Sequence, residues 1–114
     1  MIAAAVAAVA LAASPAAFVQ GRQQADGGFA EPGGTTAPGL TSWAVLGLRA
    51  AGVAASPAAH DYLVGHEAEL EAATDVELAV AAEAVSGGAS PALLDRLHGL
   101  VRPDGRIGDA VNST

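Results

Sequence analysis

The sequence contains neither cysteine nor lysine, and it has little positive charge of any kind. Without cysteine the chain has no disulfide, no thiolate metal ligand and no cysteine nucleophile. Five arginines stand against twelve acidic residues, which leaves a net charge of −7. This balance argues against nucleic acid or an anionic membrane surface as a partner, because both repel an acidic protein.

Aromatic residues are also scarce, at 4% of the chain, although hydrophobic residues make up 52%. The hydrophobic content is therefore mostly alanine, valine and leucine. Alanine and leucine are strong helix formers, so this composition favours an all-α fold with closely packed helices. The length of 114 residues fits one domain with a modest core.

The N-terminal run from Met1 to Ala13 is almost entirely hydrophobic. It is shorter than the roughly 20 residues that a membrane-spanning helix needs. Residues 1–17 fit a signal peptide, with Ala12-Ala13-Ser14 or Ser14-Pro15-Ala16 as a cleavage site, although no basic segment precedes them. They also fit an Ala-rich leading helix. The signal-peptide interpretation predicts an extracytoplasmic or secreted protein, and the alternative predicts no location.

Three Ser-Pro pairs predict three peripheral helices, which begin at Ser14, Ser56 and Ser90. Serine is a good N-cap, and proline is tolerated at the first helical position because its missing N–H is not needed there. The first of these helices is expected to reach about Gln24.

Two more hydrophobic helices are expected between the Ser-Pro helices. One runs from Thr41 to Ala51, and the other begins at a capping box formed by Thr74 and Glu77. Both are hydrophobic nearly all round, so we expect them to be inner helices that are buried on most sides. The hydrophobic stripe of Trp43, Leu46 and Ala50 is accordingly assigned to core packing, with a lipid-binding wall as the alternative.

A turn signature occurs twice, 78 residues apart, at Asp26-Gly27-Gly28 and at Asp104-Gly105. Such a recurrence between helical segments indicates a repeat architecture built from helical hairpins. The loop between Ala30 and Gly39 is rich in glycine and proline, so it is expected on the surface.

The region 18–114 resembles the repeat of squalene cyclases and protein prenyltransferases, particularly the secreted bacterial prenyltransferase/squalene oxidase repeat proteins. The resemblance implies an α/α toroid, of which this chain would form an incomplete arc. Asn112-Ser113-Thr114 stands where a third inner helix should start, so we expect the chain to be truncated there. The residues that carry the resemblance are Phe18, Gln23, Asp26, Gly27, Gly28, Phe29, Thr41 and Trp43, with Asp104 and Gly105 in the second copy.

The resemblance implies structural roles rather than chemistry. It implies that Gln23 bonds the start of a neighbouring helix, that Phe29 packs against the loop, and that Asp26 and Gly27 form the turn. The second copy has Val101 and Ile107 in place of Gln23 and Phe29, so it is expected to retain only the turn.

The catalytic motifs of these families are missing from the sequence. There is no Asp-x-Asp-Asp motif, and Pro38 and Leu40 occupy the positions that correspond to zinc ligands in the prenyltransferases. Neither side chain can bind zinc. The resemblance therefore supplies no catalytic residue, no metal ligand and no cofactor.

The remaining polar clusters fit ordinary structural roles. The acidic block of Glu67, Glu69, Glu71, Asp75 and Glu77 is interpreted as a solvated loop, with a cation site as the alternative. His66-Glu67 begins like a zinc-protease helix, but Leu70 replaces the second histidine. His60 and His98 are expected to be surface or capping residues.

Three functions are compatible with these features. The chain could be a non-catalytic repeat module that binds a lipid-like or peptide partner through a hydrophobic surface. The alternative is a fragment of a terpene cyclase or prenyltransferase whose catalytic residues lie outside this chain. A third possibility is that the chain acts only by completing a larger toroid.

Overall fold

Each Ser-Pro pair begins a helix in the computed structural model, which describes residues 14–108. These helices are α2 (Pro15–Gln20), α4 (Pro57–Gly65) and α6 (Pro91–Leu100). In each case the serine is the N-cap, and its Oγ accepts a hydrogen bond from the amide three residues further on. The donors are Ala17, Ala59 and Leu93, at 3.1, 3.4 and 3.1 Å. The sequence therefore predicts all three starts correctly, but α2 ends at Gln20 rather than Gln24.

The two inner helices are α3 (Pro38–Ala50) and α5 (Ala73–Ser86). Helix α3 begins at Pro38 instead of Thr41, because proline occupies the first helical position without losing a needed hydrogen bond. As a result Thr41 lies within the first turn of α3.

The predicted capping box of α5 is wrong. Its N-cap is Ala72, so Thr74 lies inside the helix instead of capping it. The side chain that bonds back to the N-cap is that of Asp75 and not that of Glu77. Its carboxylate accepts a hydrogen bond from the amide of Ala72 at 3.3 Å.

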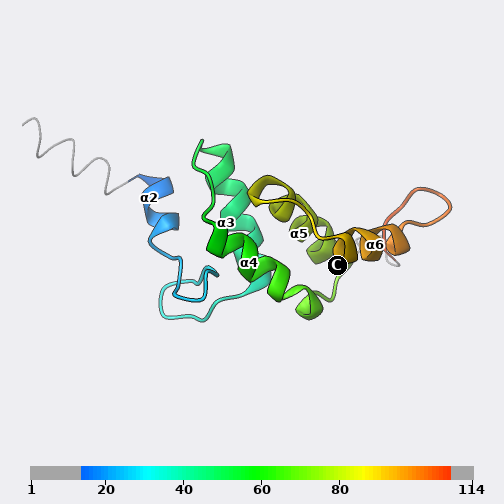
Figure 1. Ribbon diagram of the computed structural model, residues 1–114, viewed down its shortest axis with the longest axis horizontal. Helices are drawn as coiled ribbons and strands as arrows, with labels where there is room; N and C mark the ends of the chain where they lie inside the picture. Colours follow the sequence, from blue (N-terminus) through cyan, green and yellow to red (C-terminus); the bar gives the residue numbers. More distant parts are fainter. Residues whose placement is uncertain (1–13, 109–114) are drawn as a thin grey trace, which may run out of the picture.

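Helices α3 and α5 form the centre of the arrangement, and they make the most extensive helix–helix contact of the described residues. Helix α4 packs against both of them, α2 contacts α3, and α6 contacts α5 at the other end (Figure 1). A short 3-10 turn, η1 (Glu67–Glu69), follows α4. Residues 14–108 contain these helices and no strand, which confirms the all-α fold class. Among the same residues, no helix is long and hydrophobic enough to span a membrane.

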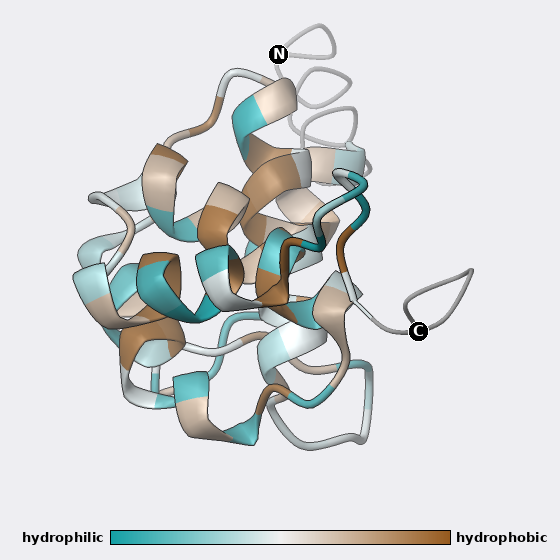
Figure 2. Cartoon of the chain, turned by 90° about the vertical axis from the view of Figure 1, so that its right-hand side faces the viewer, coloured by the Kyte–Doolittle hydropathy of each residue, from teal (hydrophilic) through white to brown (hydrophobic). Residues whose placement is uncertain are grey.

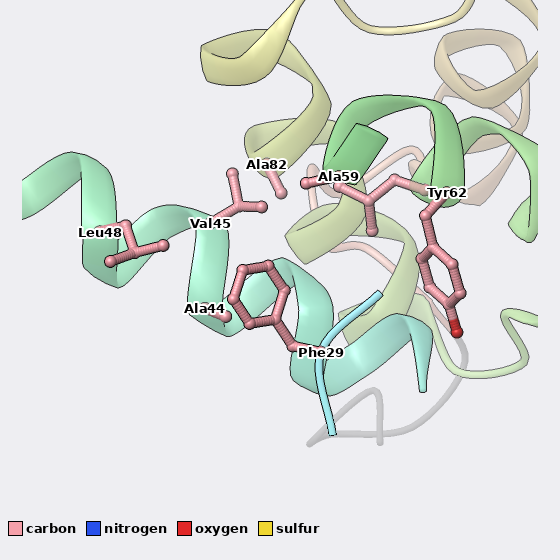
Figure 3. Packing of buried hydrophobic residues seen from close by; sticks show 8 residues of the cluster. Phe29, Ala44, Val45, Leu48, Ala59, Tyr62 and Ala82 are labelled. Atoms are coloured by element: carbon pink, nitrogen blue, oxygen red, sulfur yellow. The ribbon is translucent and has the colours of Figure 1, made fainter. Parts of the chain in front are cut away.

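The buried hydrophobic residues form two clusters. The larger one joins α3, α4 and α5 to the first loop, and Phe29 of the loop lies 2% exposed within it (Figure 3). Its members are Phe29, Ala44, Val45, Leu48, Ala59, Tyr62, Leu63 and Ala82. The smaller cluster joins α5 to α6 through Leu70, Val76, Ala79 and Leu93. Hydrophobic and hydrophilic residues are mixed along the helices (Figure 2). Five of the 13 residues of α3 and five of the 14 residues of α5 are buried, so the inner helices are not buried on most sides.

The two Asp-Gly loops share one backbone structure, and every corresponding atom pair is offset by 78 residues. In each loop an antiparallel bridge closes the turn, between Gln23 and Phe29 in the first copy and between Val101 and Ile107 in the second. The matching backbone bonds are Gln24 N to Gly28 O (2.8 Å) and Arg102 N to Arg106 O (2.7 Å), and Ala30 N to Arg22 O (3.1 Å) and Gly108 N to Leu100 O (2.9 Å). The second copy therefore retains the whole backbone of the loop, which is more than the turn that the sequence predicts.

The two turn glycines differ in their surroundings although they share a conformation. Gly27 has a φ of +90° and Gly105 a φ of +86°, a region that favours glycine. A Cβ on Gly27 would lie 2.2 Å from the carbonyl oxygen of Ala58, whereas a Cβ on Gly105 would meet nothing within 4 Å. Only the first loop is thus pressed against the start of α4.

The Gly27→Ala substitution should therefore destabilise the protein far more than Gly105→Ala. The second substitution meets only the backbone strain of a positive φ, at about 1 kcal/mol. The first must also displace the backbone of Ala58, so its cost should reach about 3 kcal/mol or more. Urea unfolding of the two variants measures the difference, and equal costs would show that the first loop does not contact α4 in solution.

Two adjacent buried hydroxyl groups on α3 differ in their hydrogen bonding, so their substitutions can be compared in the same way as those of the two glycines. Thr41 Oγ1 accepts a hydrogen bond from the amide of Phe29 at 2.9 Å and donates to the carbonyl of Ala37 at 2.7 Å. Ser42 Oγ is equally buried, yet it has no hydrogen-bond partner within the described part of the chain.

We expect Thr41→Val to destabilise the fold by about 1–3 kcal/mol, because it leaves the buried N–H of Phe29 unpaired. Ser42→Ala removes a buried polar group that gains no hydrogen bond, so its effect should lie between neutral and about 1 kcal/mol of stabilisation. Denaturant unfolding of both variants tests this contrast. A destabilising Ser42→Ala together with a neutral Thr41→Val would contradict it.

Candidate functional site

The first Asp-Gly loop is held by hydrogen bonds from its own polar side chains. Asp26 Oδ1 accepts from the amide of Gly28 at 3.0 Å, and Oδ2 accepts from the hydroxyl of Thr36 at 2.7 Å. The Thr36 hydroxyl is the main cause of the lowered pKa of Asp26, and the amide of Gly28 adds to it. The Asp26 carboxylate is therefore occupied in forming the turn.

Gln23 ties this loop to the next helical hairpin. Its Nε2 donates to the carbonyl of Gly27 at 3.0 Å and to Oγ of Ser56 at 2.8 Å. Ser56 is the N-cap of α4, so the amide of Gln23 reaches the start of a neighbouring helix. With both of its N–H groups engaged, the Gln23 amide has a structural role in the loop.

The second loop is built on the same pattern, but its residues 101–106 are exposed. Asp104 Oδ1 accepts from the amide of Arg106 at 3.0 Å, as Asp26 does from Gly28. The amide and guanidinium of Arg106 lower the pKa of Asp104. Val101, in the position of Gln23, is 48% exposed, and its side chain has no amide that could bond to a neighbouring helix.

A hydrophobic pocket of about 270 Å³ opens between α2, the end of the first loop and the start of α3. Two aromatic side chains that line it are also the most exposed large hydrophobic residues described, Phe18 at 60% and Trp43 at 64%. The full lining is Phe18, Val19, Arg22, Phe29, Ala30, Glu31, Pro32, Leu40, Trp43 and Ala44. We call this site the Phe18–Trp43 pocket.

The position of Trp43 overturns one expectation from the sequence. The stripe of Trp43, Leu46 and Ala50 is not core packing, because Trp43 and Ala50 are exposed and Leu46 is only half-buried. The buried side of α3 is instead made by Thr41, Ser42, Ala44, Val45 and Leu48. The indole of Trp43 is consequently available to a partner.

The polar groups of the Phe18–Trp43 pocket are few. Arg22 Nε donates to the carbonyl of Ala30 at 3.3 Å, so part of its guanidinium is used within the loop. Glu31 supplies the single carboxylate of the lining, and the lining includes no serine, threonine or histidine. These walls suit the binding of a hydrophobic group, and they contain no nucleophile and no pair of acids.

Phe18, Trp43 and the loop can be singled out from the sequence. The sequence does not indicate that Leu40, Val19 and Pro32 line the same pocket. The available signal is the spacing of Leu40 and Trp43, which places both on one side of a helix. The helix predicted from the sequence starts at Thr41 and therefore leaves Leu40 out. Because of this wrong boundary, the spacing of Leu40 and Trp43 could not be recognised as helical.

Two of the three histidines have structural partners. His60 Nε2 lies 2.8 Å from the carbonyl of Gly88, and the ring of His66 stacks on Tyr62 at 3.9 Å. His98 is exposed, as expected. Within residues 14–108 no group of three or more histidine, aspartate or glutamate side chains could hold a metal ion.

The acidic block is not simply a solvated loop. Its members lie on η1 and α5 as well as in the connection between them, and Glu67 is only partly exposed. Both carboxylate oxygens of Glu67 accept from the hydroxyl of Ser90, at 2.6 and 2.7 Å. One residue of the block therefore joins η1 to the start of α6.

Trp43 is the only tryptophan of the chain, so its fluorescence reports on the pocket directly. At 64% exposure, its emission should be close to that of tryptophan in water and should be readily quenched by acrylamide. Trp43→Ala should cost less than about 1 kcal/mol of stability, whereas Phe29→Ala should cost about 3–5 kcal/mol because Phe29 is buried. Strongly blue-shifted emission from the folded protein would contradict this position of the indole.

A comparison of the chain with family models, with curated proteins and with solved structures finds no match.

Proposed function

We propose that this protein is a non-catalytic helical repeat module that binds an uncharged, lipid-like chain in the Phe18–Trp43 pocket. The observation that carries the proposal is the exposure of Phe18 and Trp43, at 60% and 64%, on the lining of one hydrophobic pocket. Soluble domains rarely leave large hydrophobic patches uncovered unless a partner binds there.

The size and walls of the pocket favour one hydrocarbon chain over a larger ligand. Sites for drug-sized molecules measure about 300–1,000 Å³, and this one measures about 270 Å³. It has two exposed aromatic side chains and a single carboxylate. A flexible chain can lie between the aromatic rings and extend into solvent where the pocket is open.

Charge argues for a ligand without a negative head group. The chain carries a net charge of −7, which repels anionic ligands at long range. The guanidinium of Arg22 already donates to the carbonyl of Ala30. An alcohol or a neutral ester therefore fits this surface better than a fatty acid or a diphosphate.

The expected affinity is modest. Covering about 100 Å² of each exposed aromatic side chain at about 25 cal/mol per Å² contributes about 5 kcal/mol in total. This corresponds to a dissociation constant on the order of 0.1 mM before contacts with the aliphatic walls are added. Micromolar binding is the upper end of what such a pocket supports.

We further propose that the helices form an arc of an α/α toroid of the squalene cyclase and prenyltransferase type. Two observations support this arrangement. Helices α3 and α5 pack side by side with α4 against both, as an inner and an outer layer would. The loop that carries the sequence resemblance is also repeated with the same backbone bonds. In such an arc Trp43 belongs to an inner helix.

Titration of the full chain with 1-octanol, below its solubility limit, tests the binding proposal. The emission of Trp43 should shift to shorter wavelength and saturate, because the alkyl chain displaces water from the indole. Phe18→Ala should weaken binding about tenfold, which corresponds to losing about 1.4 kcal/mol of contact with the ring. Val64→Ala, at an exposed position outside the pocket lining, is the matched control and should bind like the wild type.

Two outcomes would count against the proposal. One is an emission spectrum that does not change up to the solubility limit. The other is an equal effect of Phe18→Ala and Val64→Ala. Mass spectrometry of farnesol recovered after incubation addresses the enzyme alternative, since a module that only binds returns the alcohol unchanged.

A further inference from the structure

The carboxyl group of Glu83 is buried in the joint between α5 and α6. The residue is 0% exposed, although it is a glutamate on a helix that also has an exposed side. Its Oε1 accepts a hydrogen bond from the amide of Ser90 at 2.9 Å. Its Oε2 is buried and has no hydrogen-bond partner among residues 14–108.

Ser90 connects this carboxyl group to a second one. It is the N-cap of α6, and its Oγ accepts from the amide of Leu93 at 3.1 Å. The hydroxyl proton of Ser90 is directed at Glu67, whose two oxygens lie 2.6 and 2.7 Å from Oγ. Glu67 and Glu83, from η1 and α5, thus converge on the residue that begins α6.

No cation pairs with either carboxylate in the part of the chain that the structure describes. The guanidinium of Arg96, on α6, donates to the main-chain carbonyls of Glu67 and Leu70 instead of to the carboxylates. The imidazole of His60, on α4, contacts the carbonyl of Gly88, and Asp61 lies 3.8 Å from that ring. The elements η1, α5 and α6 also carry Glu69, Asp75, Glu77, Asp95 and His98, none of which is buried.

Two unpaired carboxylates at the joint between α5 and α6 would destabilise the folded state. A buried charge without a counter-ion destabilises a protein by several kcal/mol, and two carboxylates that share a site cannot both ionise easily. A proton on Oε2 of Glu83 removes the charge and supplies the donor that this atom lacks. The carboxylate of Glu67 is bonded to the same Ser90, and it can accept a hydrogen bond from a protonated Glu83.

We infer that Glu67 and Glu83 bind one proton between them, and that this shared proton fastens α6 to α5. The proton is carried by Oε2 of Glu83 and donated to the carboxylate of Glu67. Together with the two bonds of Ser90, it closes a hydrogen-bonded joint between η1, the end of α5 and the start of α6. Loss of the proton places two negative charges in the joint and opens it.

The direction of the electrostatic effects agrees with this geometry. Burial is the main cause of the raised pKa of Glu83, and the charge and hydrogen bond of Glu67 raise it further. The amide of Ser90 and the imidazole of His60 act in the opposite direction. Since the pKa is higher in the folded state, the contribution to stability is complete below the ordinary value of 4.5. It is lost as the pH rises through the folded-state pKa.

The part of the molecule that would loosen is confined to one end. Helix α6 is held to α5 by the smaller hydrophobic cluster, in which Leu93 of α6 meets Val76 and Ala79. Phe29 and the Phe18–Trp43 pocket belong to the other end and do not contact this cluster. The effect of the shared proton on the contact between α5 and α6 therefore does not depend on what binds in the Phe18–Trp43 pocket.

Hydrogen exchange of the full chain at about pH 5 and about pH 8 tests the joint. After correction for intrinsic exchange, the amides of α6 should lose about tenfold in protection at the higher pH, while those of α3 should keep theirs. Glu83→Gln can place a permanent donor, the amide Nε2, where Glu83 has Oε2. It cannot ionise, so its α6 protection should not change with pH. Glu77→Gln, also on α5, is the matched control and should behave like the wild type.

Two further measurements identify the group that titrates. His60→Gln should retain the pH dependence, which shows that the imidazole, a group that commonly titrates in this range, is not its source. Carbon NMR of the wild type should show that the pKa of the Glu83 carboxyl is raised above 4.5, and this test does not depend on whether Glu83→Gln folds.

Three results would overturn the inference. The first is titration of Glu83 at its ordinary value, and the second is a pH dependence of α6 protection that persists in Glu83→Gln. The third is a rise in α6 protection with calcium or magnesium that needs Glu83, because a metal ion would then take the place of the proton.

Discussion

The burial of Phe29 is the interaction on which the rest of this structure depends. The ring lies 2% exposed among residues of α3 and α4, and its amide is bonded to the hydroxyl of Thr41 in the first turn of α3. This places the end of the Asp-Gly loop against α3 and fixes the distance between α2 and α3. The lining of the Phe18–Trp43 pocket includes the same ring. A loop that contributed only a turn would leave the pocket without this wall.

The two copies of the loop show which features depend on the loop backbone and which depend on particular side chains. Both copies close with the same bridge and the same backbone bonds, so the Asp-Gly turn suffices to form the loop. Only the first copy has Gln23, which reaches the N-cap of α4, and Phe29, which enters the core. The second copy has Val101 and Ile107 in these places and lies at the α6 end, away from α3 (Figure 1). The first loop therefore contacts neighbouring helices through Gln23, Phe29 and the close approach of Gly27 to Ala58. The second copy forms the same loop backbone without Gln23 and Phe29.

The helices and the repeat can be predicted from the sequence because they depend on local chemistry. A Ser-Pro pair caps a helix whatever surrounds it, and a positive φ requires glycine at Gly27 and Gly105 alike. The surroundings of Trp43 and Glu83 depend instead on which helices lie beside them. The prediction that Trp43 lies in the core assumes that α3 has neighbours on most sides. In the structure it does not, and Trp43 is exposed. Glu83 lies four residues after Ala79, on the buried side of α5, and that spacing is the one available sign of its burial. No local pattern predicts that it meets Glu67.

The central claim is that a hydrophobic ligand binds where Phe29 joins the loop to α3, and nowhere on the second copy of the loop. The most direct measurement is a two-dimensional ¹⁵N NMR titration of the full chain with 1-octanol. We expect saturable shifts of the Trp43 indole N–H and of the amides of Val19 and Ala44, which line the pocket. The amides of Val101 and Ile107 should not move, which makes the second loop an internal control. Equal shifts in both loops, or none at Trp43, would contradict the claim.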